Sequence, residues 1–166
     1  MLMIIMKLEA IQTLPKKRNN PRKISKLESF KKQASILELS QNFLNFNFGY
    51  FIDNDTGQSF LHWQQNETLA PFMEKLKNFS QKTKKELKQD KTLEIYHNFP
   101  PHNKTDFNLP KSLPENGIDW ARLRITGKSR IIGFFITEGT TEQKNIFYLV
   151  YLDENHLFWK SKLKHT

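Results

Sequence analysis

The stretch that decides the fold is WARLRITGKSRIIGFFI at residues 120–136, followed after a short connection by IFYLVYL at residues 146–152. Apolar and polar residues alternate over 120–126, the period of a β-strand with one buried face. Turn residues at Gly127 and Gly139 separate this segment from two more uniformly apolar runs. Because short connections favour antiparallel neighbours, the pattern predicts a three-stranded antiparallel meander at the core of a sheet.

Upstream residues predict two further strands and two helices. Residues 42–52 place aromatic side chains at nearly every second position, and residues 93–96 form a short strand-like run. Residues 59–63 and 68–87 carry apolar side chains mostly at three- and four-residue steps, which predicts helices with one buried stripe. The predicted fold class is therefore α+β, an antiparallel sheet with a C-terminal three-stranded meander, packed against two or three helices.

Two segments lack such periodicity. Residues 15–35 are rich in cations and contain two prolines, which predicts a basic, partly extended N-terminal arm over residues 1–40 with a short helix at 27–37. Residues 98–115 form a long proline-containing loop, and such loops in compact domains are usually functional or flexible. We therefore predict an arm followed by a single α+β domain over residues 41–166.

Length and composition limit the class of protein. The 166 residues are enough for one hydrophobic core. The absence of cysteine excludes disulfides, thiolate metal sites and cysteine nucleophiles. Residues 1–6 lack the basic flank and cleavage site of a signal peptide, Met6 is an alternative start, and no run approaches the roughly 20 apolar residues that cross a bilayer. We expect a cytoplasmic protein with no membrane contact.

The net charge of +9 is distributed unevenly along the chain. Residues 1–35 carry nine Lys and Arg against two acids, residues 36–73 none against four, and residues 74–91 seven against three. This segregation predicts basic faces of the kind that bind phosphates; a lysine-rich surface that serves only solubility is the alternative. We expect a polyanionic partner, first of all RNA, with Lys82 and Lys85 among its contacts.

Three arginines of the meander are candidate catalytic residues. Arg122 and Arg124 are two apart on one predicted strand, so both project from the same face, and Arg130 lies on the adjoining strand. Such guanidiniums either pair with a carboxylate, for example Glu138, or bind an anion. The second interpretation predicts that they hold a phosphodiester and stabilise its transition state, with Lys128 in the turn as a further contact.

The C-terminal segment contains residues for proton transfer and base stacking. His156 and His165 are candidate acid/base residues because imidazole titrates near neutrality. Tyr151 and Trp159 are candidates for stacking on an exposed base. The lysines of this tail are candidates for phosphate contacts: Lys160, Lys162 and Lys164. A frayed, solvated tail is the alternative interpretation.

No motif indicates a metal ion or another cofactor. The five histidines lack spacings typical of metal ligands, and Asp53-Asn54-Asp55 lacks the later ligands of a calcium loop. Glycine-rich phosphate loops and the G-x-S-x-G motif are missing too. We therefore expect neither a metal nor a cofactor.

The inferred order of elements from residue 43 onward resembles that of the RelE/YoeB-like toxin superfamily. At the level of residues the similarity covers 120–166, with its Arg-x-Arg strand, a strand like Arg130-Ile131-Ile132-Gly133-Phe134, and Tyr148-Leu149-Val150-Tyr151 before a terminal His. The resemblance implies an endoribonuclease that cuts mRNA without metal, often on the ribosome, and is neutralised by a protein antitoxin.

Carried over by position, the arginine role of these toxins falls on Arg122, Arg124 or Arg130, and the acid/base role on His165 or His156. The chain departs from the family in its greater length, its N-terminal arm of about 40 residues and its proline-rich insertion. No obvious Glu at a helix end matches the general base of the YoeB branch.

Two functions from different classes are consistent with these features. The first is a metal-independent endoribonuclease of a toxin–antitoxin or phage-defence system, whose partners are RNA, on the ribosome or free, and an acidic antitoxin protein. Attack by the 2′-hydroxyl leaves a cyclic phosphate, so DNA survives. The second is a non-catalytic nucleic-acid-binding or protein-interaction module, whose nucleic-acid affinity falls with salt and does not depend on the histidines.

Overall fold

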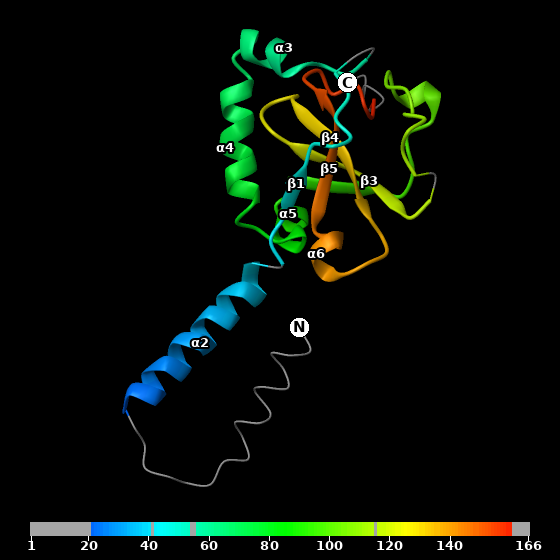
Figure 1. The fold of residues 1–166 in the computed structure, drawn as a ribbon. Helices are drawn as coiled ribbons and strands as arrows, with labels where there is room; N and C mark the ends of the chain where they lie inside the picture. The colour runs from blue at the N-terminus through cyan, green and yellow to red at the C-terminus, as the bar shows by residue number, and fades with distance from the viewer. Residues whose placement is uncertain (1–20, 41, 54–55, 115, 161–166) are drawn as a thin grey trace. The chain divides into compact units, whose positions relative to one another are not determined.

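A computed structural model of the chain describes residues 21–40, 42–53, 56–114 and 116–160 (Figure 1). The chain divides into two units, Met1–Leu37 and Glu38–Thr166. None of the described helices is both long enough and apolar enough to cross a membrane.

Helix α2 (Pro21–Ser40) contains the described residues of the first unit. Residues 21–26, which the sequence analysis places in an extended arm, are therefore helical. Proline costs little at the start of a helix, because the first N–H groups have no partner inside it. The Lys, Glu, Gln and Leu residues of this segment have high helix propensity, which outweighs the repulsion among its cations. The remaining part of the predicted arm, residues 1–20, lies outside the described residues.

The second unit contains a five-stranded sheet with the strand order β1-β5-β4-β3-β2. The strands are β1 (Asn45–Asn47), β2 (Leu93–Tyr96), β3 (Ile118–Arg124), β4 (Arg130–Ile136) and β5 (Ile146–Asp153). Strands β2, β3, β4 and β5 pair antiparallel in this order, so the predicted α+β class is confirmed and β3, β4 and β5 form a C-terminal meander within a larger sheet. Strand β1 pairs with β5 in parallel, so the prediction of a purely antiparallel sheet is wrong. The helices and the other strands separate β1 from β5, and so long a connection permits parallel pairing.

The aromatic stretch over residues 42–52 forms only the short strand β1. The backbone leaves the sheet at Gly49, whose N–H donates to Asn47 Oδ1 at 2.8 Å. It returns at Ile52, whose N–H donates to the carbonyl of Val150 at 2.9 Å. The alternation of apolar residues therefore marks a segment that follows the sheet, but not one continuous strand.

Three helices lie between β1 and β2: α3 (Phe60–Gln65), α4 (Leu69–Phe79) and α5 (Lys84–Gln89). The single helix predicted over residues 68–87 is interrupted because Thr83 begins a new one with a reciprocal cap. The N–H of Thr83 donates to Glu86 Oε2 at 2.7 Å, and the N–H of Glu86 donates to Thr83 Oγ1 at 3.3 Å. Leu76 and Leu87 are buried in the same cluster, so the apolar stripe continues across the break.

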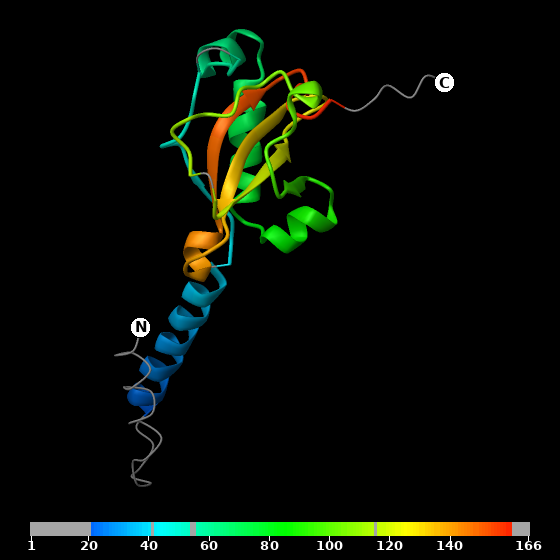
Figure 2. The ribbon, with the colours of Figure 1, turned by 90° about the vertical axis from the view of Figure 1, so that its right-hand side faces the viewer.

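The two faces of the sheet bury different clusters. One face packs against α3, α4 and α5 through residues such as Trp63 and Phe72. The other packs against the long loop after β2 and the segment after β5, with Phe107 and Phe158 against Trp120 and its neighbours. In Figures 1 and 2, α4 lies on one side of the sheet and this loop on the other. The loop is thus folded onto the sheet, and contains the 3-10 helix η1 (His102–Lys104).

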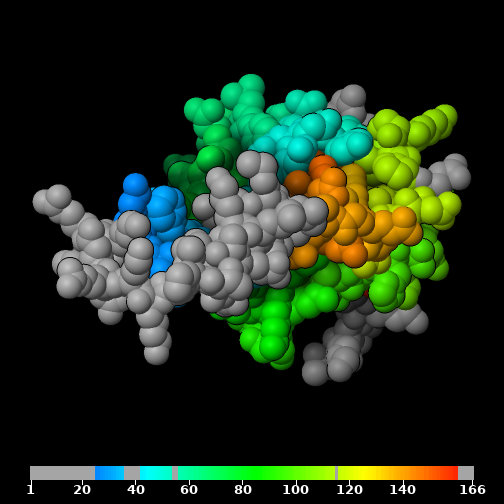
Figure 3. Space-filling model, turned by 60° about the horizontal axis from the view of Figure 1, so that its bottom comes forward, coloured from blue at the N-terminus to red at the C-terminus, as the bar shows by residue number. Residues whose placement is uncertain are grey.

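A short helix, α6 (Thr141–Lys144), joins β4 to β5. Figure 3 shows its surface, in orange, between the segment around β1, in cyan, and α5, in green. The carbonyl of Lys144 accepts a hydrogen bond from Lys84 Nζ at 2.6 Å, and the carbonyl of Asn145 accepts one from the N–H of Asn45 at 2.9 Å. These bonds attach both neighbouring elements to the end of α6.

Candidate active site

Arg122 is the centre of a hydrogen-bonded chain of three side chains. It lies on the face of the sheet opposite the helices, and Glu94 of β2 is its register partner. Arg122 Nε and Nη2 donate to Glu94 Oε2 at 3.1 and 2.5 Å. The remaining terminal nitrogen, Nη1, contacts Nε2 of His156. We call these three residues the Glu94–Arg122–His156 cluster.

His156 reaches Arg122 because the chain turns sharply after β5. The backbone φ of His156 is 60°, in the left-handed region that side chains other than glycine rarely adopt. The carboxylate of Asp153 holds this turn by accepting hydrogen bonds from the N–H groups of Leu157 and Phe158, each at 2.9 Å. Phe158 is fully buried and anchors the segment on the sheet.

The charges around His156 favour its neutral form. Partial burial is the main cause that lowers the pKa of His156, and the positive charges of Arg122 and Arg130 lower it further. The negative charges of Asp153 and Glu94 oppose this shift but do not cancel it. The imidazole is therefore neutral near pH 7. A neutral imidazole has one nitrogen that accepts a proton, which is what a general base needs.

A pair of stacked rings lies beside the cluster. The rings of Tyr96 and Trp159 are 4.7 Å apart with an interplanar angle of 6°. Arg122 Cζ lies 5.9 Å from the centre of the Tyr96 ring, and Lys104 Nζ lies 5.7 Å from that of Trp159. The hydroxyl of Tyr96 is buried and has no hydrogen-bond partner among the described residues, and burial is the main cause that raises the pKa of Tyr96. Aromatic rings and cations thus line the same part of this face.

Comparisons with protein-family models, curated proteins and solved structures found no match to the chain. Within the described ranges, no group of three or more His, Asp or Glu side chains could hold a metal ion.

The three predicted arginines do not share one position. Arg122 occupies the centre of the cluster, whereas Arg124 is exposed at the end of β3. Arg130 is only 5 % exposed, and its Nη1 donates to the carbonyls of Gly127 and Ser129 at 2.9 and 2.8 Å. Burial is the main cause that lowers the pKa of Arg130, and the positive charges of Arg124 and Arg122 lower it further. The side chain of Arg130 therefore stabilises the turn between β3 and β4. Although it is buried, its positive charge still acts on His156.

The aromatic and basic residues predicted to bind nucleic acid also differ in placement. Tyr151 is 3 % exposed and donates to the carbonyl of Asn108 at 2.9 Å, so its ring is not open to a base. Trp159 is partly exposed beside the cluster. Lys160, the residue after Trp159, forms an ion pair with Asp106. Lys128 is exposed in the turn after β3.

Two of the lysines predicted to contact RNA lie on the side of the sheet that the helices cover. Lys82 pairs with Asp90 at 2.9 Å, and Lys85 is exposed on α5, whose Leu87 packs on the face opposite the cluster. They are therefore separated from Arg122 by the sheet. His165, Lys162 and Lys164 lie outside the described residues.

Glu94 and Tyr96 were not predicted from the sequence as residues of the site. Both belong to a strand of only four residues, where they alternate with Leu93 and Ile95 and so share a face. This alternation was the available signal. It could not show that Glu94, and not Glu138, pairs with Arg122, because that depends on the register between β2 and β3.

Proposed function

We propose that this protein binds RNA and cleaves it without a metal ion, as a toxin-like endoribonuclease that acts in the cytoplasm within a toxin–antitoxin or phage-defence system. The single observation that carries the proposal is the Glu94–Arg122–His156 cluster beside the stacked rings of Tyr96 and Trp159. It combines a cation for a phosphate, a neutral base and an aromatic surface for a nucleobase. The sequence resemblance to RelE/YoeB-like toxins is consistent with this assignment and adds an acidic antitoxin protein as an expected partner.

The proposed reaction begins when a phosphodiester takes the place of His156 at Arg122 Nη1. The freed imidazole removes the proton from the ribose 2′-hydroxyl, and the 2′-oxygen forms a bond to phosphorus. Arg122 stabilises the extra negative charge of the transition state. The bond from phosphorus to the 5′-oxygen then breaks, and the imidazolium returns its proton to that oxygen. The products are a 2′,3′-cyclic phosphate and a 5′-hydroxyl.

In this mechanism Glu94 positions the guanidinium. Its two hydrogen bonds fix the plane of Arg122, so that Nη1 is directed toward the place where His156 and the phosphate compete. The side chain of Arg122 is 19 % exposed, and that of Glu94 is 52 % exposed. A phosphate can therefore approach from solvent, and the solvated carboxylate repels it less than a buried one would.

The experiment compares the full chain with a His156→Ala variant on radiolabelled RNA, either free, with and without EDTA, or on translating ribosomes in the Mg²⁺ that they require. His102→Ala is the matched control, because His102 is an exposed histidine of η1. We expect cleavage that survives EDTA, spares DNA, leaves a cyclic phosphate, and is lost only in His156→Ala. Cleavage that EDTA abolishes, or that His156→Ala retains, would overturn the proposed mechanism.

A second candidate function is a non-catalytic nucleic-acid-binding module. The observation that favours it is the ion pair between Arg122 and Glu94, which already neutralises the central cation. On this alternative RNA is bound on and off the ribosome but never cut, and His156→Ala binds as tightly as the unaltered protein. RNA-binding measurements on the same two proteins, beside the cleavage assays, therefore separate the two candidates.

A further inference from the structure

Four side chains beside the proposed active site form a row in which each contacts the next: Arg122, Tyr96, Trp159 and Lys104. Two cations therefore lie at the ends of the row, and two stacked rings lie between them. Lys104 comes from η1 of the long loop after β2, whereas Trp159 belongs to the segment after β5. The N–H of Lys160 donates to the carbonyl of Lys104 at 2.8 Å, which attaches the loop to this end of the row.

Trp159 offers the ring face at which a ligand can join the row. One face of its ring is stacked on Tyr96, and the ammonium of Lys104 lies over the ring, 5.7 Å from its centre. Trp159 is partly exposed, whereas Trp63 and Trp120 are only 0 and 3 % exposed. Trp159 is therefore the tryptophan of this chain on which a planar group from solvent can stack.

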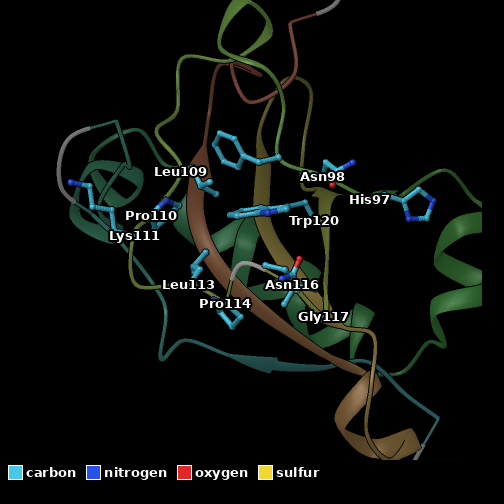
Figure 4. Close-up of a pocket in the computed structure, with 12 residues that line it drawn as sticks. His97, Asn98, Leu109, Pro110, Lys111, Leu113, Pro114, Asn116, Gly117 and Trp120 are labelled. Carbon is cyan, nitrogen blue, oxygen red and sulfur yellow. The ribbon is translucent and has the colours of Figure 1, made fainter.

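The hollow between the start of β3 and the long loop does not provide such a face (Figure 4). Its volume is about 590 Å³, and Trp120 lies at its centre in Figure 4. The ring of Trp120 is packed against three other aromatic side chains: Phe99, Phe134 and Phe158. A base that enters the hollow would find no free ring to stack on.

Lys104 is the cation of the row that is available to a phosphate. It is exposed and forms no ion pair with any residue that the structure describes, whereas Lys160 is paired with Asp106. The ammonium of a lysine is carried on a flexible chain of four carbons. It can therefore move from the ring of Trp159 to a phosphate when a base takes its place. Because two rings separate Lys104 from Arg122, the two cations contact different phosphates of one strand.

We propose that Trp159 and Lys104 form a subsite for a nucleotide of single-stranded RNA, beyond the phosphate that Arg122 holds. The base stacks on Trp159, and a phosphate next to it binds Lys104. The inference rests on the proposed function and adds a subsite to it. Proteins bind single strands of any sequence by combining aromatic stacking with cations along the backbone. A duplex keeps its bases stacked on one another, so this subsite favours unpaired RNA.

The first test measures Kd values of the full chain for short single-stranded RNAs at several salt concentrations. The RNAs carry 2′-O-methyl groups, which remove the attacking hydroxyl and so prevent cleavage. We expect Lys104→Ala to raise the Kd about 3- to 10-fold. The slope of log K against log salt should become shallower by about 0.7, the contribution of one phosphate contact in a single strand.

Lys111→Ala is the matched control for this change of charge. Lys111 is an exposed lysine of the same loop, and in Figure 4 it lies on the opposite side of the hollow from His97, the residue after Tyr96. We expect it to leave the Kd nearly unchanged. Equal effects of Lys104→Ala and Lys111→Ala, or no effect of Lys104→Ala, would overturn the inference.

Asp106 allows a test with the opposite sign. Asp106→Asn removes the partner of Lys160 and so frees a second ammonium next to Trp159. RNA should then bind more tightly, and the salt dependence should become steeper. Lys160→Ala should have less effect than Lys104→Ala, because the ion pair already neutralises Lys160. An unchanged or higher Kd in Asp106→Asn would show that the strand does not pass Trp159.

Stacking is measured through the indole N–H signals of the tryptophans in ¹H–¹⁵N NMR, with the Trp159 signal assigned from a Trp159→Phe variant. We expect RNA to shift this signal to saturation. The Trp63 signal should stay in place, because that indole is fully buried on the other face of the sheet. Polyglutamate carries negative charge but no bases. If it binds as tightly as single-stranded RNA of the same charge, the surface fits an acidic protein and the inference is wrong.

The outcomes separate this inference from the proposed function. Cleavage that requires His156, in a protein whose RNA binding is indifferent to Lys104 and leaves the Trp159 signal in place, would support the nuclease and overturn the subsite. Binding that depends on Lys104 and shifts the Trp159 signal, in a protein that never cleaves RNA, would support the subsite and overturn the nuclease. If no RNA binds and none is cut, both proposals fail.

Discussion

Glu94 and Arg122 face each other across β2 and β3, and a single carboxylate oxygen, Oε2, accepts hydrogen bonds from both Nε and Nη2 of the guanidinium at 3.1 and 2.5 Å. This geometry leaves Nη1 of Arg122 for His156. The pairing therefore orients the one arginine of the meander that is both partly exposed and next to a histidine.

Replacing Arg122 with Lys should strongly reduce RNA cleavage. An ammonium keeps the charge but cannot hold the planar contacts to Glu94 and His156 at once. We expect the cleavage rate to fall about 100- to 1,000-fold, the usual cost of losing a donor that stabilises the transition state. Single-turnover cleavage measures this, and Arg124→Lys, at the exposed end of β3, is the matched control. Full activity in Arg122→Lys would show that only the positive charge matters, and equal losses in both variants would show that Arg122 has no special role.

Replacing Glu94 with Gln distinguishes positioning from proton transfer. The amide oxygen can still accept from Arg122, so the guanidinium keeps its orientation. We expect Glu94→Gln to retain cleavage within about 10-fold, whereas His156→Ala loses the roughly 100- to 10,000-fold that a general base contributes. If Glu94→Gln is as inactive as His156→Ala, then Glu94 is the base and the roles assigned here are reversed.

The pH profile should report the environment of His156. Because burial and the neighbouring arginines lower its pKa, the imidazole stays neutral, and able to act as base, to a lower pH than an ordinary histidine with a pKa near 6.5. Cleavage should therefore decline with acid only below that pH. Glu94 raises the pKa of His156, so Glu94→Gln should move the decline to still lower pH. Histidine NMR titration checks the assignment; a decline above pH 6.5 would contradict it.

The sheet itself predicts one severe substitution, Gly133→Ala. Gly133 lies at the register shift between β4 and β5, where an added Cβ would overlap the carbonyl oxygen of Tyr148 and approach the Phe147 ring to 2.8 Å. We expect a loss in free energy of unfolding of at least about 1–3 kcal/mol, measured by denaturant unfolding. Gly49→Ala is the control, since its nearest neighbour is the flexible side chain of Asn47, and its effect should stay within about 0.5 kcal/mol.

The sequence by itself determined those strands and turns whose patterns involve only residues close together in the chain. The alternation over residues 120–126, the turn at Gly127 and the apolar runs that follow were enough to predict the meander, because strand period and turn formation depend on residues a few positions apart. The same period of two placed Arg122 and Arg124 on one face. The four-residue strand β2 was predicted with its correct bounds.

Only the tertiary structure decided which side chains meet. The partner of Arg122 depends on the register of β2 against β3, and the intervening loop leaves that register undefined in the sequence. The register shift between β4 and β5 places Val150 and Tyr151, neighbours in the chain, in the same buried cluster, so Tyr151, predicted to stack on a base, is only 3 % exposed. Burial of this kind, like the parallel pairing of β1 with β5, is set by contacts between residues far apart in the chain, and no local pattern encodes them.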